Sequence, residues 1–483
     1  LESWVRELRD AFGPAMNANR TMGALGGIVA SRIARAFNVG GPSFTLSSEE
    51  SSGLRSLEAG VRALQRNEIS TAIVGAVDIA SDIRSLGKAQ GAGSNLNDTL
   101  KSDGAAAVIL KRHEDALADG DQIYAIIKGM GAANAGSATV KAGMVSAYKE
   151  AVKRSLNDSG VELDSISLVE GHAGSQAEDK AREIDALGQL FKERGMTTPC
   201  ALTNVKADIG HSGAAGGLAS LVKTTLCLHH QVIPAHRGAE DLYADIKNSE
   251  ALYAPRQSQF WLRDSVAGPR RALLSSFSVD GNFVNAVVEG VENNTALSNG
   301  LNDTSKECLF SICAENKKAL IDSLQRLMTL ASASSHSTLP ALAARWWHEQ
   351  AENQRRAKAV SIIGSGIDEL LTLLNLALKK VEADESHSDD KLFYSVEPLA
   401  SKGKVAYVFP GSGSHFIGMG REMSTCWSQV LARLDDENES LSSQFASSRF
   451  WARENTSGFT NEDFIFGQVW LGAMVSDVIS SFA

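Results

Sequence analysis

The clearest periodic pattern in the chain follows residue 50. Apolar residues recur there at intervals of three and four, with charged residues between them, which is the pattern of an amphipathic helix. The apolar positions are Leu54, Leu57, Val61 and Leu64. This spacing predicts a helix over residues 51–66. The stretch that begins at Gly40 is expected to be a strand, and it ends at two adjacent acids, Glu49 and Glu50.

Continuous apolar runs further along the chain predict buried strands. Residues 71–77 and 104–111 are runs of the kind expected in a sheet that is covered on both faces. A helix is expected over about 146–157, with strands at 166–170 and 286–289. Strands and helices that alternate in this way predict a layered α/β architecture.

A polar stretch separates this first module from a smaller one. Residues 293–305 are rich in Asn, Ser, Thr and Gly, and we interpret them as a linker. The smaller α/β unit is expected to contain strands at 309–312 and 360–363 and a helix at 315–332. The acidic stretch 384–390 is expected to be a solvated loop.

Three domains follow from these boundaries. They cover residues 1–292, 307–400 and 404–483, and the last one opens with a predicted strand at 404–409. The length of 483 residues also predicts about three domains, on a scale of ~150 residues each. Because the first residue is Leu and the last residues resemble an interrupted helix, we expect the chain to be part of a longer protein.

The composition is that of an ordinary, mildly acidic globular protein. The formal net charge is −10, with 43% hydrophobic and 22% charged residues. Because the charge provides no basic face for phosphates, nucleic acid is not an expected partner. The apolar stretches are too short to span a bilayer and no signal segment opens the chain, so we expect a cytoplasmic protein without a membrane partner.

The five cysteines are scattered along the chain, without a CxxC pair or a cluster with histidine. They are Cys200, Cys227, Cys308, Cys313 and Cys426. Their spacing predicts neither a zinc site nor a disulfide framework, and no bound metal is expected. None of them lies near the strand-to-helix junction at residue 50.

Glu50 has two interpretations. A carboxylate in the first turn of a helix is favourable because the N–H groups there are unpaired and the helix dipole is positive, so Glu50 could simply be a helix-start acid. The second interpretation starts from Gly-Pro-Ser-Phe-Thr at 41–45 and Ser-Ser at 51–52. This stretch resembles the nucleophile elbow of the β-ketoacyl synthases, and in register the catalytic Cys of that family falls on Glu50.

The resemblance has a chemical consequence for residue 50. A carboxylate cannot carry the thioester that condensation needs, because the thiol acts by forming a labile acyl bond and releasing it. The stretch from Ala116 to Gly129 also matches the ketosynthase family closely. The first module therefore resembles a thiolase-fold ketosynthase that has lost its nucleophile.

Two histidines follow predicted strands. His172 lies in Val-Glu-Gly-His-Ala-Gly-Ser-Gln, and His211 lies in Asn-Val-Lys-Ala-Asp-Ile-Gly-His-Ser-Gly. A lone histidine in a loop is usually a structural polar residue. In their order and spacing, however, these segments resemble the two histidine motifs of ketosynthases. The resemblance implies that His172 and His211 line the acyl site and that Lys206 supports it.

In ketosynthases the two imidazoles donate hydrogen bonds to a malonyl thioester and stabilise the enolate that forms on decarboxylation. Keeping both histidines without the thiol leaves decarboxylation conceivable, whereas condensation is not. Two motifs depart from the family pattern, which argues against an intact pocket. The departures are Ala173, Gly174 and Gln176 after the first histidine, and Phe283 and Asn285 in place of the usual Asn and His of the closing motif.

Two glycine-rich segments resemble other kinds of site at first sight. Gly210–Ala214 begins like the Gly-x-Ser-x-Gly elbow of hydrolases, but the final Gly is missing. Residues 409–418 follow a predicted strand like a dinucleotide loop, but the third glycine is one place late. Neither a hydrolase site nor a nicotinamide site is supported, and no bound cofactor is expected.

Residues 409–422 instead resemble the opening strand and oxyanion loop of malonyl/acyl-carrier-protein acyltransferases. Ser412 stands where a Gln is usual. The resemblance implies that the backbone N–H of Ser412 helps to hold the oxyanion, a role that does not depend on the side chain. The serine and histidine of that family would lie beyond residue 483, so this α/β acyltransferase domain is expected to be truncated.

The combination of a module without a nucleophile, a linker domain and an acyltransferase resembles the chain-length-factor region of polyunsaturated fatty acid synthases, which are related to type I polyketide synthases. It implies a non-catalytic or substrate-shaping partner of an active ketosynthase, in a dimer-like pairing. Acyl and malonyl groups are expected on the phosphopantetheine of an acyl carrier protein or on coenzyme A. Two alternatives stay open: a malonyl-thioester decarboxylase that uses His172 and His211, and a protein in which only the complete acyltransferase is active.

Overall fold

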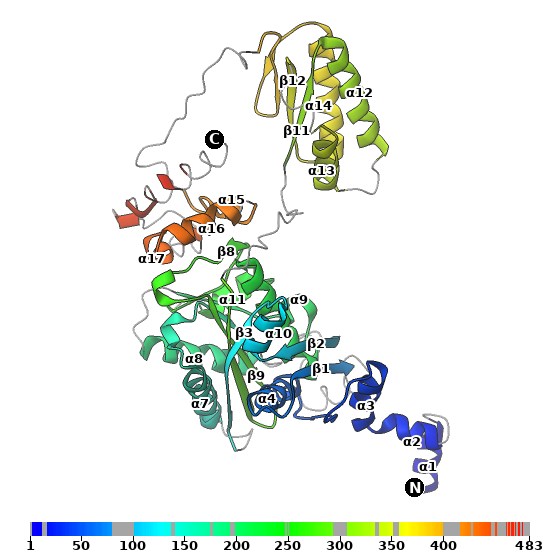
Figure 1. Ribbon diagram of the computed structural model, residues 1–483, viewed down its shortest axis with the longest axis vertical. Coiled ribbons are helices and arrows are strands. Elements are labelled where there is room, and N and C mark those ends of the chain that lie inside the picture. Colours follow the sequence, from blue (N-terminus) through cyan, green and yellow to red (C-terminus); the bar gives the residue numbers. More distant parts are fainter. Residues whose placement is uncertain are drawn as a thin grey trace. The chain divides into compact units, whose positions relative to one another are not determined.

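The computed structural model of the chain contains two compact units (Figure 1). The first comprises Leu1–Ala296, His415–Arg421 and Leu431–Leu471, and the remaining residues form the second. The structure describes residues 2–11, 17–79, 101–136, 141–173, 177–193, 199–246, 249, 251–292, 307–333, 338–350, 357–398, 416–426, 428–445 and separate positions from 450 onward. The predicted linker at 293–305 lies outside the described residues.

A six-stranded mixed sheet forms the centre of the first unit. Its strand order is β3, β10, β9, β4, β5, β7, with antiparallel pairing among the first three strands and parallel pairing from β9 to β7. β9 and β10 are buried along almost their whole length, as expected of a sheet covered on both faces. The strands are β3 (Ile126–Asn134), β4 (Leu168–Glu170), β5 (Cys200–Thr203), β7 (Leu252–Tyr253), β9 (Arg271–Phe277) and β10 (Asn282–Glu289).

Helices cover both faces of this sheet. On one face, α7 (Lys141–Ser159) packs on β3 and β10, and α8 (Ala177–Glu193) packs beside α7. On the other face, α10 (Gly216–His230) packs on β9 and contacts α4 (Ser52–Gln65). The helix predicted near 146–157 and the strands predicted at 166–170 and 286–289 are confirmed as α7, β4 and β10. The layered α/β architecture is therefore present.

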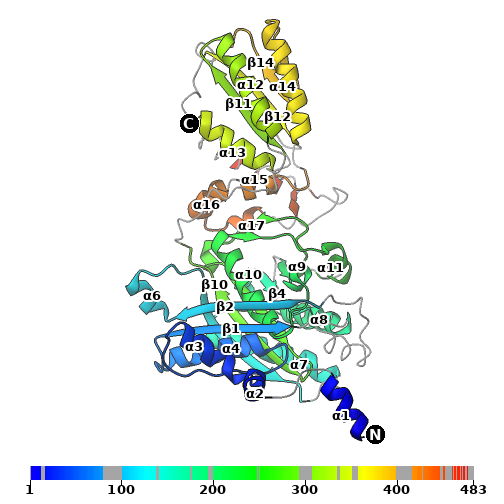
Figure 2. The ribbon, with the colours of Figure 1, turned by 90° about the vertical axis from the view of Figure 1, so that its right-hand side faces the viewer.

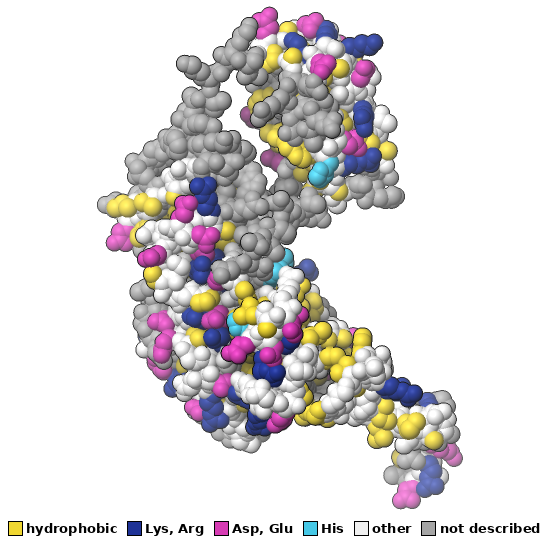
Figure 3. Space-filling view, viewed as in Figure 1, with side chains coloured by type: hydrophobic (Ala, Val, Ile, Leu, Met, Phe, Trp, Pro, Cys, Tyr) yellow, Lys and Arg dark blue, Asp and Glu magenta, His cyan; other side chains and the backbone are white. Residues whose placement is uncertain are grey.

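β1 (Thr71–Ile79) and β2 (Asp103–Lys111) form a separate antiparallel sheet beyond α4 and α10 (Figure 2). The prediction of two strands is confirmed, but the prediction that both faces are covered is wrong. Ile73, Val77 and Ile109 are 46%, 60% and 75% exposed, and Figure 3 shows hydrophobic side chains at the surface of this region. An apolar run alone cannot distinguish a strand with one covered face from a strand with two.

The amphipathic helix predicted over 51–66 is confirmed as α4. Its contact with α10 depends on two glycines. A Cβ on Gly53 would lie 2.9 Å from the carbonyl oxygen of Ala214, and a Cβ on Gly217 would lie 2.9 Å from Leu54 Cγ. Interiors are packed closely enough that a single added carbon is felt, so these positions set how near the two helices approach each other.

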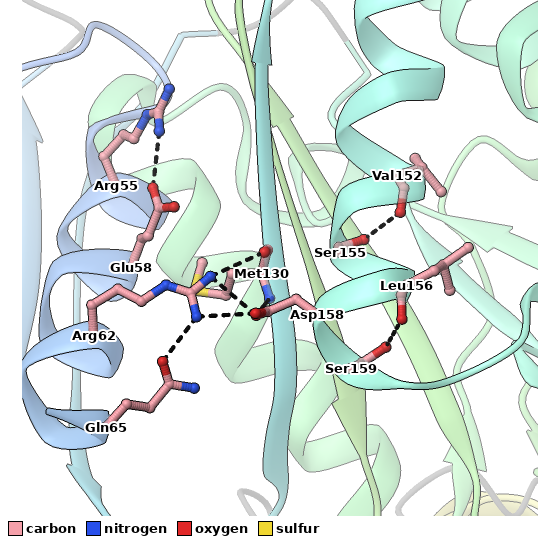
Figure 4. A network of polar contacts seen from close by, with 10 residues as sticks. All are labelled: Arg55, Glu58, Arg62, Gln65, Met130, Val152, Ser155, Leu156, Asp158 and Ser159. Atoms are coloured by element: carbon pink, nitrogen blue, oxygen red, sulfur yellow. Dashed lines mark hydrogen bonds and ion pairs between the residues drawn. The ribbon is translucent and has the colours of Figure 1, made fainter.

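A polar contact ties α4 to α7 across β3 (Figure 4). The Arg62 guanidinium donates to both carboxylate oxygens of Asp158 at 3.1 Å and to the carbonyl of Met130 at 3.4 Å. The same carboxylate accepts the Met130 N–H at 2.8 Å. Because the two charged side chains are 32% and 29% exposed, their contact adds little stability, but it joins three elements of the fold.

The packing of α7 on β3 gives a prediction for stability. A Cβ on Gly131 would lie 2.3 Å from the Ala151 carbonyl oxygen and from the Ser155 nitrogen. Because backbone atoms cannot rotate away, Gly131→Ala is expected to lower the free energy of unfolding by about 1–3 kcal/mol. Gly75→Ala is the control, since its Cβ would meet its nearest neighbour at 3.7 Å. Equal urea unfolding midpoints for the two variants would contradict this account.

Shorter elements complete the first unit. β6 (Val232–Ile233) and β8 (Gln259–Phe260) pair with each other in an antiparallel manner. No helix in the described part of the chain is long and apolar enough to cross a bilayer. The other helices are α1 (Glu2–Ala11), α2 (Ala18–Ala24), α3 (Gly27–Ala36), α6 (His113–Asp119), α9 (Lys206–Ile209) and α11 (Ala239–Ile246), with single turns at Leu163–Ser165, Gly213–Ala215 and Ser265–Ala267.

The second unit contains an antiparallel sheet in the order β11, β12, β14, β13. α12 and α14 pack against each other and on β11 and β12, which confirms the predicted strands at 309–312 and 360–363 and the helix at 315–332. The stretch 384–390 is largely exposed as expected, but it contains the short β13. The elements are β11 (Cys308–Ala314), α12 (Lys317–Ala333), α13 (Leu339–Gln350), β12 (Lys358–Gly364), α14 (Ile367–Glu382), β13 (His387–Ser388) and β14 (Leu392–Tyr394).

The described residues from 416 onward lie mainly in short helices. The predicted strand at 404–409 and Ser412 lie outside the described residues. Within the first unit, the buried Asp435 carboxylate of α16 accepts hydrogen bonds from Arg263 at 2.7 Å and Arg270 at 3.0 Å. This contact joins α16 to the segment that leads into β9. The helices here are α15 (Arg421–Cys426), α16 (Ser428–Glu437) and α17 (Leu441–Phe445).

Candidate active site

Four residues that the sequence singled out lie in neighbouring loops of the first unit. Glu50 precedes α4, His172 follows β4, Lys206 opens α9 and His211 follows α9. Because β4 and β5 are parallel neighbours, the loops that leave their carboxyl ends share one edge of the sheet. The Lys206 Nζ lies 3.1 Å from Nε2 and 3.3 Å from Nδ1 of His172, and the two histidine rings are 6.2 Å apart between centroids.

His172 is held through both its backbone and its ring. The Glu183 carboxylate accepts the N–H of His172 and the N–H of Ala173, each at 2.8 Å. The imidazole lies 4.2 Å from the ring of Phe277, measured between centroids. Because both N–H groups donate to one carboxyl group on α8, this pair of contacts orders the loop after β4.

Glu183 is the site residue that sequence reasoning missed. It lies on α8 and is 5% exposed. Burial raises its pKa, and the backbone hydrogen bonds from His172 and Ala173 oppose that rise. A signal for it does exist in the sequence, because Ala186 and Leu187, one helical turn later, are apolar and fully buried. An acid on the apolar face of an amphipathic helix points to a buried partner.

Burial determines the charge of the three basic groups. It lowers the pKa of Lys206 to about 7, against the opposing charges of Glu50 and Glu183. Burial, helped by the nearby Lys206 cation, also lowers the pKa of His211 to about 3 and holds that of His172 well below its usual value. Both imidazoles are therefore neutral at pH 7, and each offers one N–H donor. Neutral donors of this kind suit a carbonyl oxygen that gains negative charge.

The same pKa shift predicts how stability depends on pH. Between about pH 3 and pH 6.5 the unfolded chain binds a proton at His211 that the folded chain does not bind. The free energy of unfolding therefore rises with pH across this window. His211→Gln is expected to flatten the rise by up to about 1.4 kcal/mol per pH unit, as measured by urea unfolding. Identical slopes for the two proteins would contradict the burial of a neutral imidazole.

Glu50 lies where the sequence predicts it, at the start of α4. Its carboxylate accepts the Val279 N–H at 3.3 Å, and its carbonyl oxygen accepts the Ser276 hydroxyl at 3.2 Å. Val279 belongs to the turn between β9 and β10. The strand predicted before Glu50 is not formed, since residues 40–47 have no regular secondary structure. An extended stretch becomes a strand only when a neighbouring strand pairs with it.

The two departures in the closing motif are part of the packing next to the site. Phe283 is buried, and its ring lies 5.4 Å from that of Phe277 between centroids. Asn285 is fully buried and donates to the Ser275 hydroxyl at 2.9 Å. The Tyr148 hydroxyl lies 2.7 Å from the same oxygen. Phe283 thus supports Phe277, which in turn contacts His172.

The described cysteines provide no obvious nucleophile. Cys200, Cys227, Cys308 and Cys313 are buried free thiols. Burial raises the pKa of Cys200, and it raises the pKa of Cys227 to about 12. A thiol with a raised pKa carries too little thiolate at neutral pH to attack an acyl group. Among the described residues, no group of three metal-ligating side chains is placed to hold a metal ion.

Two protein-family descriptions match the part of the chain that contains the four site residues. "Beta-ketoacyl synthase, N-terminal domain" matches residues 6–116, and "Beta-ketoacyl synthase, C-terminal domain" matches residues 124–240. The first range contains Glu50. The second contains His172, Lys206 and His211, so all four site residues lie inside the matched ranges.

Polyketide synthases are among the similar proteins. Phthioceranic/hydroxyphthioceranic acid synthase from Mycobacterium tuberculosis is 28% identical over 412 residues, which cover 82% of this chain and 19% of that protein. Orsellinic acid synthase from Armillaria ostoyae is 27% identical over 417 residues, which cover 82% of this chain and 18% of that protein. The chain therefore spans about a fifth of the length of these relatives.

Solved ketosynthase structures share the fold. The ketosynthase from module 6 of the bacillaene synthase of Bacillus subtilis 168 is 25% identical, with a TM-score of 0.50, over 74% of this chain and 63% of that chain. An oxazolomycin ketosynthase domain from Streptomyces albus JA3453 shows the same fold at 21% identity and a TM-score of 0.52, over 80% of this chain and 67% of that chain. Residues 6–116 and 124–240 therefore correspond to the N- and C-terminal domains of β-ketoacyl synthases, with a thiolase-like mixed α/β fold, and the chain is similar to polyketide synthases.

Proposed function

We propose that this ketosynthase region does not condense acyl groups itself and acts as the chain-length factor, or substrate-shaping partner, of an active ketosynthase. The observation that carries the proposal is the Glu50 carboxylate at the start of α4, bonded to the Val279 N–H at 3.3 Å. A carboxylate cannot form and release the thioester that condensation requires. Cys200 and Cys227 offer no substitute, since burial suppresses the ionisation of both thiols.

Glu50 also alters the site around it. Its negative charge favours the protonated form of Lys206. Its hydrogen bond engages the Val279 N–H, a donor that a thioester carbonyl could otherwise use. An acyl group that entered the site would have to displace this carboxylate. Glu50 therefore stands in place of the nucleophile and also engages a backbone N–H donor, while the two histidines remain in place.

The partners follow from the kind of protein to which the chain is related. Ketosynthase modules of polyketide synthases typically work with acyl carrier proteins and pair as dimers. We infer that the partner of this region is a catalytic ketosynthase, and that acyl and malonyl groups arrive on the phosphopantetheine of an acyl carrier protein or on coenzyme A. An obligate pairing of this kind would bury on the order of 2,000 Å² or more.

The test is reconstitution of the full-length parent protein with the ketosynthase of its pathway and an acyl carrier protein. We expect the two proteins to co-purify. Glu50→Trp should shorten the product, because the larger ring would fill more of the space between the start of α4 and the turn at Val279. Glu50→Gln, which keeps the size of the side chain, is the matched control and should leave product length unchanged. Association without any response of product length to Glu50→Trp would contradict a chain-length role.

A second candidate function is the decarboxylation of malonyl thioesters, which the proximity of His172, Lys206 and His211 favours. The bond between the carboxylate and the α-carbon breaks, carbon dioxide leaves, and the electron pair forms an enolate that the imidazole N–H groups stabilise. The enolate carbon then takes a proton from water to give the acetyl thioester. No step in this reaction needs a thiol on the protein.

The C-terminal region is proposed to be the front of an acyltransferase, with the backbone N–H of Ser412 in its oxyanion loop. Acyl transfer needs a nucleophile and a base in one folded site. Residues 404–483 resemble only the part of that fold that comes before its serine.

A further inference from the structure

The loop that carries His211 touches the β1–β2 sheet at the histidine itself and again three residues later. Before β2, the Ser102 N–H donates to the His211 carbonyl oxygen at 3.1 Å. At the end of β1, the Asp78 carboxylate accepts the Ala214 N–H at 2.8 Å. The sheet on the far side of α4 and α10 thus holds a loop whose imidazole faces His172.

The fit between this loop and the sheet leaves little room. Asp78 and Gly104 pair across β1 and β2, and both lie against the loop. A Cβ on Gly104 would lie 2.5 Å from Ser212 Cβ, and a Cβ on Gly213 would lie 2.0 Å from Asp78 Oδ2. Gly213 has φ +48°, a conformation that favours glycine. The loop therefore packs closely, at one defined position, against the end of the sheet.

The hydrogen bond to Asp78 also replaces a helix cap. Ala214 lies in the turn Gly213–Ala215, which leads directly into α10. The residues just before that turn and before α10 supply no side-chain cap of their own. The first N–H groups of a helix lack backbone partners, and a carboxylate at this end also interacts favourably with the helix dipole. Asp78 supplies that carboxylate from a different element.

We propose that Asp78 is a positioning residue for His211, which holds its loop as Glu183 holds the loop of His172. Its effect on chemistry rests on the proposed decarboxylation, because His211 must lie within hydrogen-bond distance of the thioester oxygen to act there. Small displacements of a positioned group cost large factors in rate. Its effect on the order of the loop does not depend on that reaction.

The test compares Asp78→Ala with Asp78→Asn in the full chain. Asp78→Ala should speed hydrogen exchange at the Ala214 amide about tenfold or more, since a charge-assisted hydrogen bond is lost. It should also lower the kcat of decarboxylation about tenfold and leave KM nearly unchanged. Asp78→Asn should restore most of both values, because its amide oxygen can accept the same N–H. Asp119→Ala, which removes an exposed partner of Lys111 on the same sheet, is the control.

The two readouts separate this proposal from the proposed reaction. Faster exchange at Ala214 in a protein without measurable decarboxylation would support the loop role and reject the reaction. Unchanged exchange in Asp78→Ala, or exchange in Asp78→Asn as fast as in Asp78→Ala, would overturn the proposal.

A second pair of variants applies if Asp78→Ala does not fold. Gly104→Ala should displace the loop and speed exchange at Ala214, because its Cβ would meet Ser212 Cβ at 2.5 Å. Adding Ser212→Gly removes that clash and should return the exchange toward the wild-type rate. A wild-type exchange rate in Gly104→Ala alone would overturn the proposed close packing of the loop on the sheet.

Discussion

His211→Ala is expected to slow the release of carbon dioxide from malonyl-carrier protein by about 10²-fold, the scale of losing one oxyanion donor. The centroids of the His172 and His211 rings are 6.2 Å apart, which is near enough for both to donate to one oxygen. The pKa of His211 lies at about 3, so its imidazole is a neutral donor at the pH of the assay. Removing one of two donors leaves the developing enolate charge with half of its support.

The control for this experiment lies in the second unit. His387 forms an exposed contact with Asp389, and His387→Ala should keep the wild-type rate. The measurement is the time course of carbon dioxide release, together with the mass of the acetyl product. Equal rates in His211→Ala and wild type would contradict the role of His211. No release above buffer from the wild type would leave the non-catalytic, chain-length role as the remaining function.

The sequence predicted the elements whose pattern is local. The three- and four-residue spacing of Leu54, Leu57, Val61 and Leu64 predicts α4 to within about a residue at each end, because the spacing of apolar residues on one helical face is set within that helix. The apolar runs at β1 and β2 predict strands correctly for the same reason. Whether a strand has one covered face or two depends on what packs against it, and here Ile73 and Val77 are exposed.

The site residues also divide into those that local sequence patterns reveal and those that only tertiary contacts reveal. Glu50, His172, Lys206 and His211 could be selected because they follow the ends of predicted elements and match motif spacings. Glu183 and Asp78 could not be selected in this way, since each acts on a loop that belongs to another element. Glu183 accepts from residues 10 and 11 positions away, and Asp78 accepts from a residue 136 positions away. Only the folded chain shows which backbone N–H groups their carboxylates accept.

The second large effect is expected at residue 50. Glu50→Cys would place a thiol at the start of α4, where the positive end of the helix dipole lowers a thiol pKa. It would also release the Val279 N–H, which could then hold the carbonyl oxygen of an attached acyl group. We therefore expect the variant to change from no covalent acylation to nearly complete acylation by an acyl thioester. Glu50→Gln, which removes the negative charge without adding a nucleophile, should stay unmodified.

The central claim is that residue 50 of this ketosynthase region cannot carry an acyl group, and intact-mass measurement tests it most directly. Wild type and Glu50→Cys are each incubated with the same acyl thioester, and any adduct is then mapped by peptide mass. The account predicts an unmodified wild type and one acyl group on Glu50→Cys, within residues 47–53. An acyl group mapped to residues 47–53 of the wild-type chain would contradict it.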